Sequence, residues 1–143
     1  MPARDGDLAD LHLLTEAAAA AGAIARRYFD GEAKVWDKGD GQGPVTEADL
    51  AVNEHLHRML GRARPGYGWL SEESNPLGNL ARLSHERCFV IDPIDGTRAF
   101  IDRQPGFAHA LAVTERGRPV AAVVHLPMLD LTYAAVLGGG ATL

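Results

Sequence analysis

The segment Cys88–Thr97 reads CFVIDPIDGT and is the most informative stretch of the chain. An apolar run typical of a buried strand leads directly into two carboxylates three residues apart, Asp92 and Asp95. Pro93 fixes its own φ and has no N–H to donate, so the strand is not expected to continue through it as a central ladder member. Gly96 allows a sharp turn and a close approach to a ligand. We therefore predict a buried strand that ends at a pair of acids.

The residues after this pair add a place for an anion. If Thr97–Ile101 begins a helix, its first N–H groups lack helical partners and suit a phosphate. Hard oxygen ligands for a divalent metal would then lie beside a phosphate cradle, which is an arrangement for metal-assisted phosphate chemistry. Asp-Pro and Asp-Gly pairs are also common in turns, so a solvated loop is the alternative interpretation.

Composition narrows the class of protein. A chain of 143 residues is long enough for one domain with a core and too short for two ordinary domains. Its 46% hydrophobic and 23% charged residues are typical of a soluble globular protein. The net charge of −5, with no Lys/Arg run longer than a pair, argues against binding a nucleic-acid polymer. We expect no membrane span and no signal peptide, and therefore a cytoplasmic protein.

Helical periodicity dominates the first half of the chain. Apolar residues at spacings of three and four predict a helix over Asp7–Asp30, with Gly31 as its stop. The segment Asp37–Pro44 is rich in glycine and is expected to be a mobile loop. A second helix is predicted over Glu47–Leu60, ended by Gly61.

Strands dominate the second half. A short strand is predicted over Tyr67–Ser71, and longer strands over Phe107–Thr114, Val120–Leu126 and Leu131–Leu137. The segment Glu115–Arg118 suits a short hairpin connection. Two helices followed by hairpin-linked strands predict an α+β fold, with two N-terminal helices packed on a mostly antiparallel sheet.

Glu72 and Glu73 follow the first short strand and supply further acids. Successive strand residues point to opposite faces, so only one of the two glutamates readily faces a given metal. The other would hydrogen-bond to the metal ligands and orient them. Taken alone, such a pair is more often a surface turn. Together with Asp92 and Asp95, these residues form a set of oxygen ligands that selects Mg²⁺ or Mn²⁺ over zinc.

Two interpretations compete for Asp49. Thr46, followed by Asp49 three residues later, is a capping-box pattern for the second helix. Alternatively, Asp49 projects toward the metal site and accepts a proton from an attacking water through Thr97. Local sequence favours the cap. Lys38, in the glycine-rich loop, could bring a positive charge over a phosphate or a metal-bound water.

Other chemistries receive little support. The single cysteine, Cys88, is expected to be a buried hydrophobe, which leaves no disulfide framework or cysteine-ligated zinc. The histidines show no ligand spacing, and His109 and His125 lie in apolar strands where a core role is favoured over metal binding. The sequence has no Gly-x-Ser-x-Gly elbow and no Walker loop.

Three motifs in this order resemble the inositol monophosphatase superfamily of Mg²⁺-dependent, lithium-sensitive phosphatases. They are Pro44–Asp49 (PVTEAD), Leu70–Glu73 (LSEE) and Asp92–Thr97 (DPIDGT), and the resemblance covers almost the whole chain. It implies the first half of a layered αβαβα sugar-phosphatase fold. It also implies hydrolysis of a small phosphomonoester by direct in-line displacement, with metals that polarise the phosphoryl oxygens and activate a water.

The resemblance assigns a role to each residue of the predicted site. Gly96 and Thr97 would bind the phosphate through their amides. Thr97 and Asp49 would together activate the water, and Lys38 would match the family's loop lysine. Glu73 and Thr46 would orient the residues that contact the metal and the phosphate, without contacting either themselves. The metal ligands would be Glu72, Asp92, Asp95 and the carbonyl of Ile94.

The resemblance leaves the substrate and the extent of the protein open. Inositol monophosphate is one candidate substrate, although Leu70–Glu73 and Gly96–Ile101 look more like bacterial 3′(2′),5′-bisphosphate nucleotidases and histidinol-phosphate phosphatases. Fold analogy alone does not choose among them. Members of the family are nearly twice as long, so we expect residues 1–143 to be the N-terminal metal- and phosphate-binding domain, without the C-terminal subdomain. The alternative is a non-catalytic metal- and phosphate-binding module, which could form a homodimer through its uncovered sheet.

Overall fold

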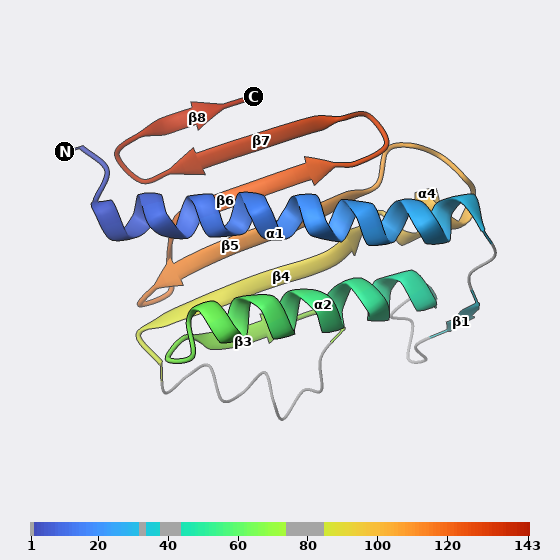
Figure 1. Cartoon of the computed structure of the whole chain (residues 1–143), viewed down its shortest axis with the longest axis horizontal. Coiled ribbons are helices and arrows are strands. Elements are labelled where there is room, and N and C mark those ends of the chain that lie inside the picture. The colour runs from blue at the N-terminus through green and yellow to red at the C-terminus, as the bar shows by residue number, and fades with distance from the viewer. Residues whose placement is uncertain (1, 32–33, 38–43, 74–84) are drawn as a thin grey trace.

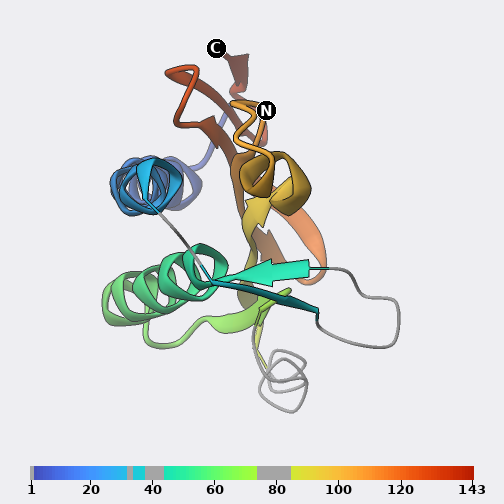
Figure 2. The same ribbon diagram turned by 90° about the vertical axis from the view of Figure 1, so that its right-hand side faces the viewer.

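The protein, seen in a computed structural model, places two long helices on one face of a six-stranded sheet (Figures 1 and 2). The structure describes residues 2–31, 34–37, 44–73 and 85–143, so Lys38 lies outside the described residues. Helix α1 packs on strands β5, β6 and β7, and helix α2 packs on β4 and on α1. The predicted α+β fold with a mostly antiparallel sheet is confirmed.

Within the described residues, three helices lie close to their predicted positions. They are α1 (Asp5–Asp30), α2 (Glu47–Ala63) and the short α4 (Thr97–Ile101). The prediction that Gly61 ends α2 is wrong, because the helix continues to Ala63. A glycine inside a helix costs only about 1 kcal/mol relative to alanine, and the fully buried Leu60 beside it holds this turn against the core.

The expectation that no segment is apolar enough to span a membrane is also wrong. By length and composition alone, α1 qualifies as a candidate span. In the fold, however, Leu14, Ala17 and Ala21 of this helix have no exposed surface and belong to the core shared with the sheet. The small residues let α1 lie close to β6, where a Cβ added at Gly22 would come within 3.0 Å of His125 Nε2. The apolar face of α1 therefore packs on protein.

The main sheet has the strand order β3-β4-β5-β6-β7-β8. Every neighbouring pair is antiparallel except β3 and β4, which are parallel. The strands are β3 (Gly68–Ser71), β4 (Arg87–Asp95), β5 (Ala108–Glu115), β6 (Arg118–Leu126), β7 (Leu131–Val136) and β8 (Gly140–Thr142).

Two connections test the predictions for turns. The β5–β6 hairpin is confirmed: Arg116 and Gly117 both have positive φ, +51° and +80°, as a two-residue type I′ turn requires. The expectation of a loop over Asp37–Pro44 is corrected at both ends. Strands β1 (Val35–Asp37) and β2 (Pro44–Thr46) pair with each other there, and residues 38–43 between them lie outside the described residues.

Strand β4 ends at Asp95, and Pro93 is not a member of its ladder, as predicted; the ladder is interrupted at Pro93 and resumes at Asp95. Asp92 pairs with Ala110 and Asp95 with Ala108, so two residues of β4 face the single residue between those partners on β5. This two-against-one register is a β-bulge, which bends the strand and leaves the extra residue unpaired. Pro93, which cannot donate to the ladder, lies inside the bulge. The two acids therefore flank a bend at the end of β4.

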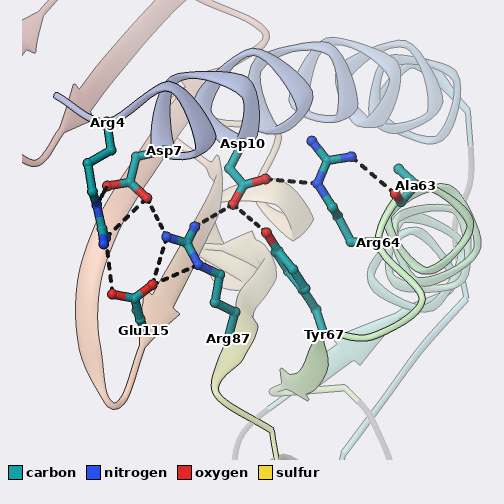
Figure 3. Close-up of polar contacts among 8 residues, drawn as sticks. All are labelled: Arg4, Asp7, Asp10, Ala63, Arg64, Tyr67, Arg87 and Glu115. Carbon is teal, nitrogen blue, oxygen red and sulfur yellow. Dashed lines mark hydrogen bonds and ion pairs between the residues drawn. The ribbon is translucent and has the colours of Figure 1, made fainter.

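At the opposite end of β4, Arg87 is surrounded by three carboxylates (Figure 3). Its Nη2 lies 2.6 Å from Asp7 Oδ1 and its Nη1 lies 2.9 Å from Asp10 Oδ2. Its Nε donates to Glu115 Oε2 at 3.0 Å. Asp7 and Asp10 belong to the first turns of α1 and are buried, with 0% and 1% exposure. One guanidinium thus joins α1 to the start of β4 and the end of β5.

Three more side chains complete this arrangement. The two oxygens of Asp10 accept from Arg64 Nε at 2.9 Å and from the Tyr67 hydroxyl at 2.8 Å. Arg4 donates to Asp7 at 3.0 Å. We call the whole set the Arg87 cluster; its members are Arg4, Asp7, Asp10, Arg64, Tyr67, Arg87 and Glu115.

We expect Arg87→Leu to lower the free energy of unfolding by about 3–5 kcal/mol, because it leaves Asp7 and Asp10 buried without their shared partner. The matched control is Arg58→Leu, which removes an exposed arginine 3.5 Å from Glu54 on α2. An exposed pair of this kind contributes about 0–1 kcal/mol. Urea unfolding followed by circular dichroism measures both variants. Equal losses in the two variants would contradict the structural importance of the cluster.

The same cluster predicts a response to acid. Burial raises the pKa of Asp7, but hydrogen bonds from Arg87 and Arg4 outweigh burial, so the pKa lies below its ordinary value. Asp7 therefore stabilises the fold above its ordinary pKa of about 4, and this contribution is lost as the pH falls through the lowered value. In Arg87→Leu, urea midpoints measured from pH 7 to pH 3 should show a weaker dependence on pH.

Candidate metal and phosphate site

The parallel pairing of β3 and β4 brings two acidic segments to one edge of the sheet. Ser71 is in register with Ile91, so Glu72 follows β3 at the level where Asp92 extends β4. The Glu72 N–H donates to the carbonyl of Ile91 at 3.3 Å, and the Glu73 N–H donates to Ser71 Oγ at 3.3 Å. Backbone geometry therefore holds the two glutamates beside the end of β4.

Asp92 is close enough to Glu72, Glu73 and Asp95 for each of these acids to raise its pKa. Burial raises its pKa to about 7, supported by a hydrogen bond with Glu72 and by the negative charges of Glu72, Asp95 and Glu73. Its Oδ1 is buried and has no hydrogen-bond partner. A divalent cation would supply a partner for that oxygen and relieve the repulsion among the carboxylates. The donor set, made only of oxygens, fits Mg²⁺.

The acids are close to one another but do not form a closed set of ligands. Among residues 2–31, 34–37, 44–73 and 85–143, no three histidine, cysteine or acidic side chains are arranged to hold a metal ion. Glu72 and Asp95 are exposed at the edge of the sheet, whereas Asp92 is half-buried. The assignment of these three residues and Ile94 as metal ligands therefore stays a prediction.

Asp49 makes both of the contacts that sequence analysis treated as alternatives. Its Oδ2 accepts from the Thr46 N–H at 2.9 Å and from Thr46 Oγ1 at 2.6 Å, while its own N–H donates to Thr46 Oγ1 at 3.2 Å. This is the predicted capping box. Its other oxygen, Oδ1, accepts from Thr97 Oγ1 at 2.9 Å. One fully buried carboxylate thus caps α2 and holds the hydroxyl that follows the acid motif.

The turn after Asp95 is shaped by Gly96 and Thr97. Gly96 has φ +90°, a conformation that other residues rarely adopt, and its carbonyl accepts from Phe100 N to begin α4. Thr97 Oγ1 also lies 3.3 Å from the carbonyl of Ile94. Because a hydroxyl carries one proton, the shorter contact with Asp49 takes it and the Ile94 carbonyl keeps its lone pairs for another partner. Phosphate binding by the Gly96 and Thr97 amides stays a prediction.

His109 is a residue of the site region that sequence analysis interpreted only as core. It has no exposed surface, and burial lowers its pKa to about 4, so the ring is neutral near pH 7. Its Nδ1 bonds to the carbonyl of Pro93, inside the bulge of β4. Strand periodicity places His109 in the core but gives no sign of the bulge opposite, so this contact was not predicted.

Comparison with known proteins places the chain in a family. A sequence profile of the inositol monophosphatase family matches residues 9–143, and the chain belongs to that family. It is 38% identical over 133 residues to a 3′(2′),5′-bisphosphate nucleotidase CysQ of Aggregatibacter actinomycetemcomitans, covering 91% of this chain and 49% of that protein. It is 36% identical to an inositol-1-monophosphatase of Mesorhizobium japonicum, covering 92% and 48%.

Solved structures agree with the sequence comparison. The extragenic suppressor protein suhB of Bartonella henselae superposes with a TM-score of 0.86 at 31% identity, over 94% of this chain and 51% of that one. The inositol monophosphatase TM1415 of Thermotoga maritima gives a TM-score of 0.81 at 28% identity, over 95% and 50%. The chain spans about half the length of the curated relatives it matches.

We expect Asp92 to take up a proton near pH 7 in EDTA-treated protein. Because its folded-state pKa is raised, the folded protein binds a proton that the unfolded chain does not, and the free energy of unfolding falls as the pH rises from about 4 to about 7. Asp92→Asn should remove this dependence, while the exposed Asp130→Asn retains it. Carbon-detected NMR titration of the carboxyl groups measures the pKa, and a value near 4 would contradict the description of the acids given above.

Proposed function

We propose that this chain provides the metal- and phosphate-binding domain of a Mg²⁺-dependent phosphomonoesterase that acts on a small phosphorylated metabolite. The observation that carries the proposal is the contact between Asp49 Oδ1 and Thr97 Oγ1 at 2.9 Å, beside the acids at the ends of β3 and β4. The capping box uses Oδ2 of Asp49, and the second contact joins the other oxygen of this carboxylate to the hydroxyl beside the acid motif. Family membership supports the same chemistry.

The proposed mechanism assigns the proton transfers to this chain. A water held by Thr97 Oγ1 gives its proton to that oxygen, while the Thr97 hydroxyl proton moves to Asp49 Oδ1. The resulting hydroxide forms a bond to phosphorus, and the ester P–O bond breaks to release an alkoxide. Bound Mg²⁺ would polarise the phosphoryl oxygens and stabilise the leaving oxygen, with Glu72, Asp92, Asp95 and the Ile94 carbonyl as its proposed ligands.

Three kinds of phosphatase among the relatives support the proposed substrate class. They include 3′(2′),5′-bisphosphate nucleotidases, an inositol-1-monophosphatase and a histidinol-phosphatase of Mycobacterium tuberculosis that is 41% identical over 97 residues. Each of these names describes removal of a phosphate from a small molecule. We propose inositol monophosphate as a substrate, with a nucleoside 3′(2′),5′-bisphosphate and histidinol phosphate as the alternatives.

We expect Mg²⁺-dependent phosphate release from at least one of these three compounds. Glu72→Gln and Asp92→Asn should each lower kcat/KM by at least about 10²-fold, because each removes a proposed ligand of the ion that stabilises the transferred phosphoryl group. Thr97→Val should also lower it, whereas Thr97→Ser keeps the hydroxyl and should retain most of it. The measurement is colorimetric detection of phosphate with and without EDTA.

Asp130→Asn is the matched control, because this exposed acid lies in the β6–β7 turn, two strands across the sheet from β4, and its φ of +52° suits asparagine. Full Mg²⁺-dependent activity of Asp92→Asn or Glu72→Gln would overturn the mechanism. Binding of Mg²⁺ and phosphate by the chain, without release from any of the three compounds, would instead favour the non-catalytic module.

A further inference from the structure

The bulge in β4 places Pro93 and Ile94 opposite His109 on β5. The register runs from Asp92↔Ala110 to Asp95↔Ala108, and His109 is the one residue of β5 between these partners. Bulges disrupt the ladder locally, so backbone groups inside them need partners from elsewhere. Pro93 is buried and lies inside this bulge.

The partner of the Pro93 carbonyl is the His109 side chain. His109 Nδ1 bonds to this oxygen, and a carbonyl can only accept, so Nδ1 carries the ring proton. His109 Nε2 is buried and has no partner. The hydrogen bond to the Pro93 carbonyl therefore holds the His109 ring in the tautomer with its proton on Nδ1. Pro93 belongs to the backbone of the acid motif Asp92–Thr97.

This carbonyl belongs to the peptide plane that joins Pro93 to Ile94. Because a peptide unit is planar, fixing the orientation of the Pro93 carbonyl also fixes the N–H of Ile94 and limits the directions that its own carbonyl and Asp95 can take. We propose that His109 is a positioning residue, which sets the Ile94 carbonyl and the Asp95 carboxylate through its hydrogen bond to Pro93. This inference rests on the metal site proposed above.

His125 provides a comparison within the same core. It lies directly across from His109 on β6, and the two ring centroids are 6.2 Å apart. It is also buried, but its Nδ1 bonds to Thr132 Oγ1 at 2.9 Å, on β7 and away from the bulge. If His109 only filled space, substitution of either histidine would have similar effects on the site.

The test uses the full chain with three variants. His109→Leu removes the donor, His109→Asn keeps an N–H at the same distance along the side chain, and His125→Leu removes the neighbouring buried histidine. Mn²⁺ affinity is measured by isothermal titration calorimetry. Hydrogen exchange of the backbone amides at residues 94–97 is measured by NMR.

We expect His109→Leu to weaken Mn²⁺ binding about 10–100-fold, the range found when a group that orients metal ligands is lost. Exchange at residues 94–97 should become faster in the same variant. His109→Asn should restore most of both, and His125→Leu should change Mn²⁺ affinity by less than about 2-fold. A folded His109→Leu with wild-type affinity and exchange, or equal effects in His125→Leu, would overturn the proposal.

Two readouts keep this proposal separate from the proposed function. The ¹⁵N spectrum of the His109 ring in the unsubstituted protein should show the proton on Nδ1, and a proton on Nε2 overturns the proposal even if His109→Leu fails to fold. Asp92→Asn tests the metal site itself. If that variant binds Mn²⁺ as the unsubstituted protein does, the proposed function fails, and the exchange rates and the tautomer still decide whether His109 positions the bulge.

Discussion

The fold depends on the ion pairs that Arg87 makes at the start of β4. Asp7 and Asp10 of α1 are buried where the helix begins, and a carboxylate is costly to bury without a cation close by. The guanidinium supplies that cation and also reaches Glu115 at the end of β5. The cluster therefore fixes the position of α1 along the sheet as well as the start of β4.

The two ends of β4 are built in opposite ways. At Arg87, each buried acid has a cationic partner and further hydrogen bonds from Arg4, Arg64 or Tyr67. At Asp92, the neighbouring charged groups are other acids, and one buried oxygen has no partner. Polar groups left unsatisfied in a native protein are typical of functional sites, where stability elsewhere offsets their cost. The stability that the Arg87 cluster contributes at one end of β4 therefore offsets the cost of the unpaired Asp92 oxygen at the other end.

Sequence reasoning predicted those features that depend on local pattern. The acid motif after the strand, the capping box at Thr46 and the short hairpin between β5 and β6 each follow from a few adjacent residues. The Arg87 cluster was missed because its members are scattered; Arg87 and Asp7 are 80 positions apart. Nothing in their local spacing indicates that they meet. The short strands β1, β2 and β8 were missed because glycine and proline dominate their surroundings.

The sequence indicated that Pro93 interrupts the ladder but gave no sign that the interruption is a bulge. Pro93 cannot donate to a ladder, and from this we expected it not to be a central ladder member; in the structure the ladder breaks locally and then resumes at Asp95. A strand that ended at Pro93 would leave Asp95 on an unpaired segment with no fixed relation to Asp92. A strand that continues through a bulge keeps Asp95 tied to Ala108 while turning it relative to Asp92. Pro93 thus lies in a β-bulge within the sheet, between the two acids of the site. His109, the residue opposite the bulge, bonds to the Pro93 carbonyl and is proposed to position the site.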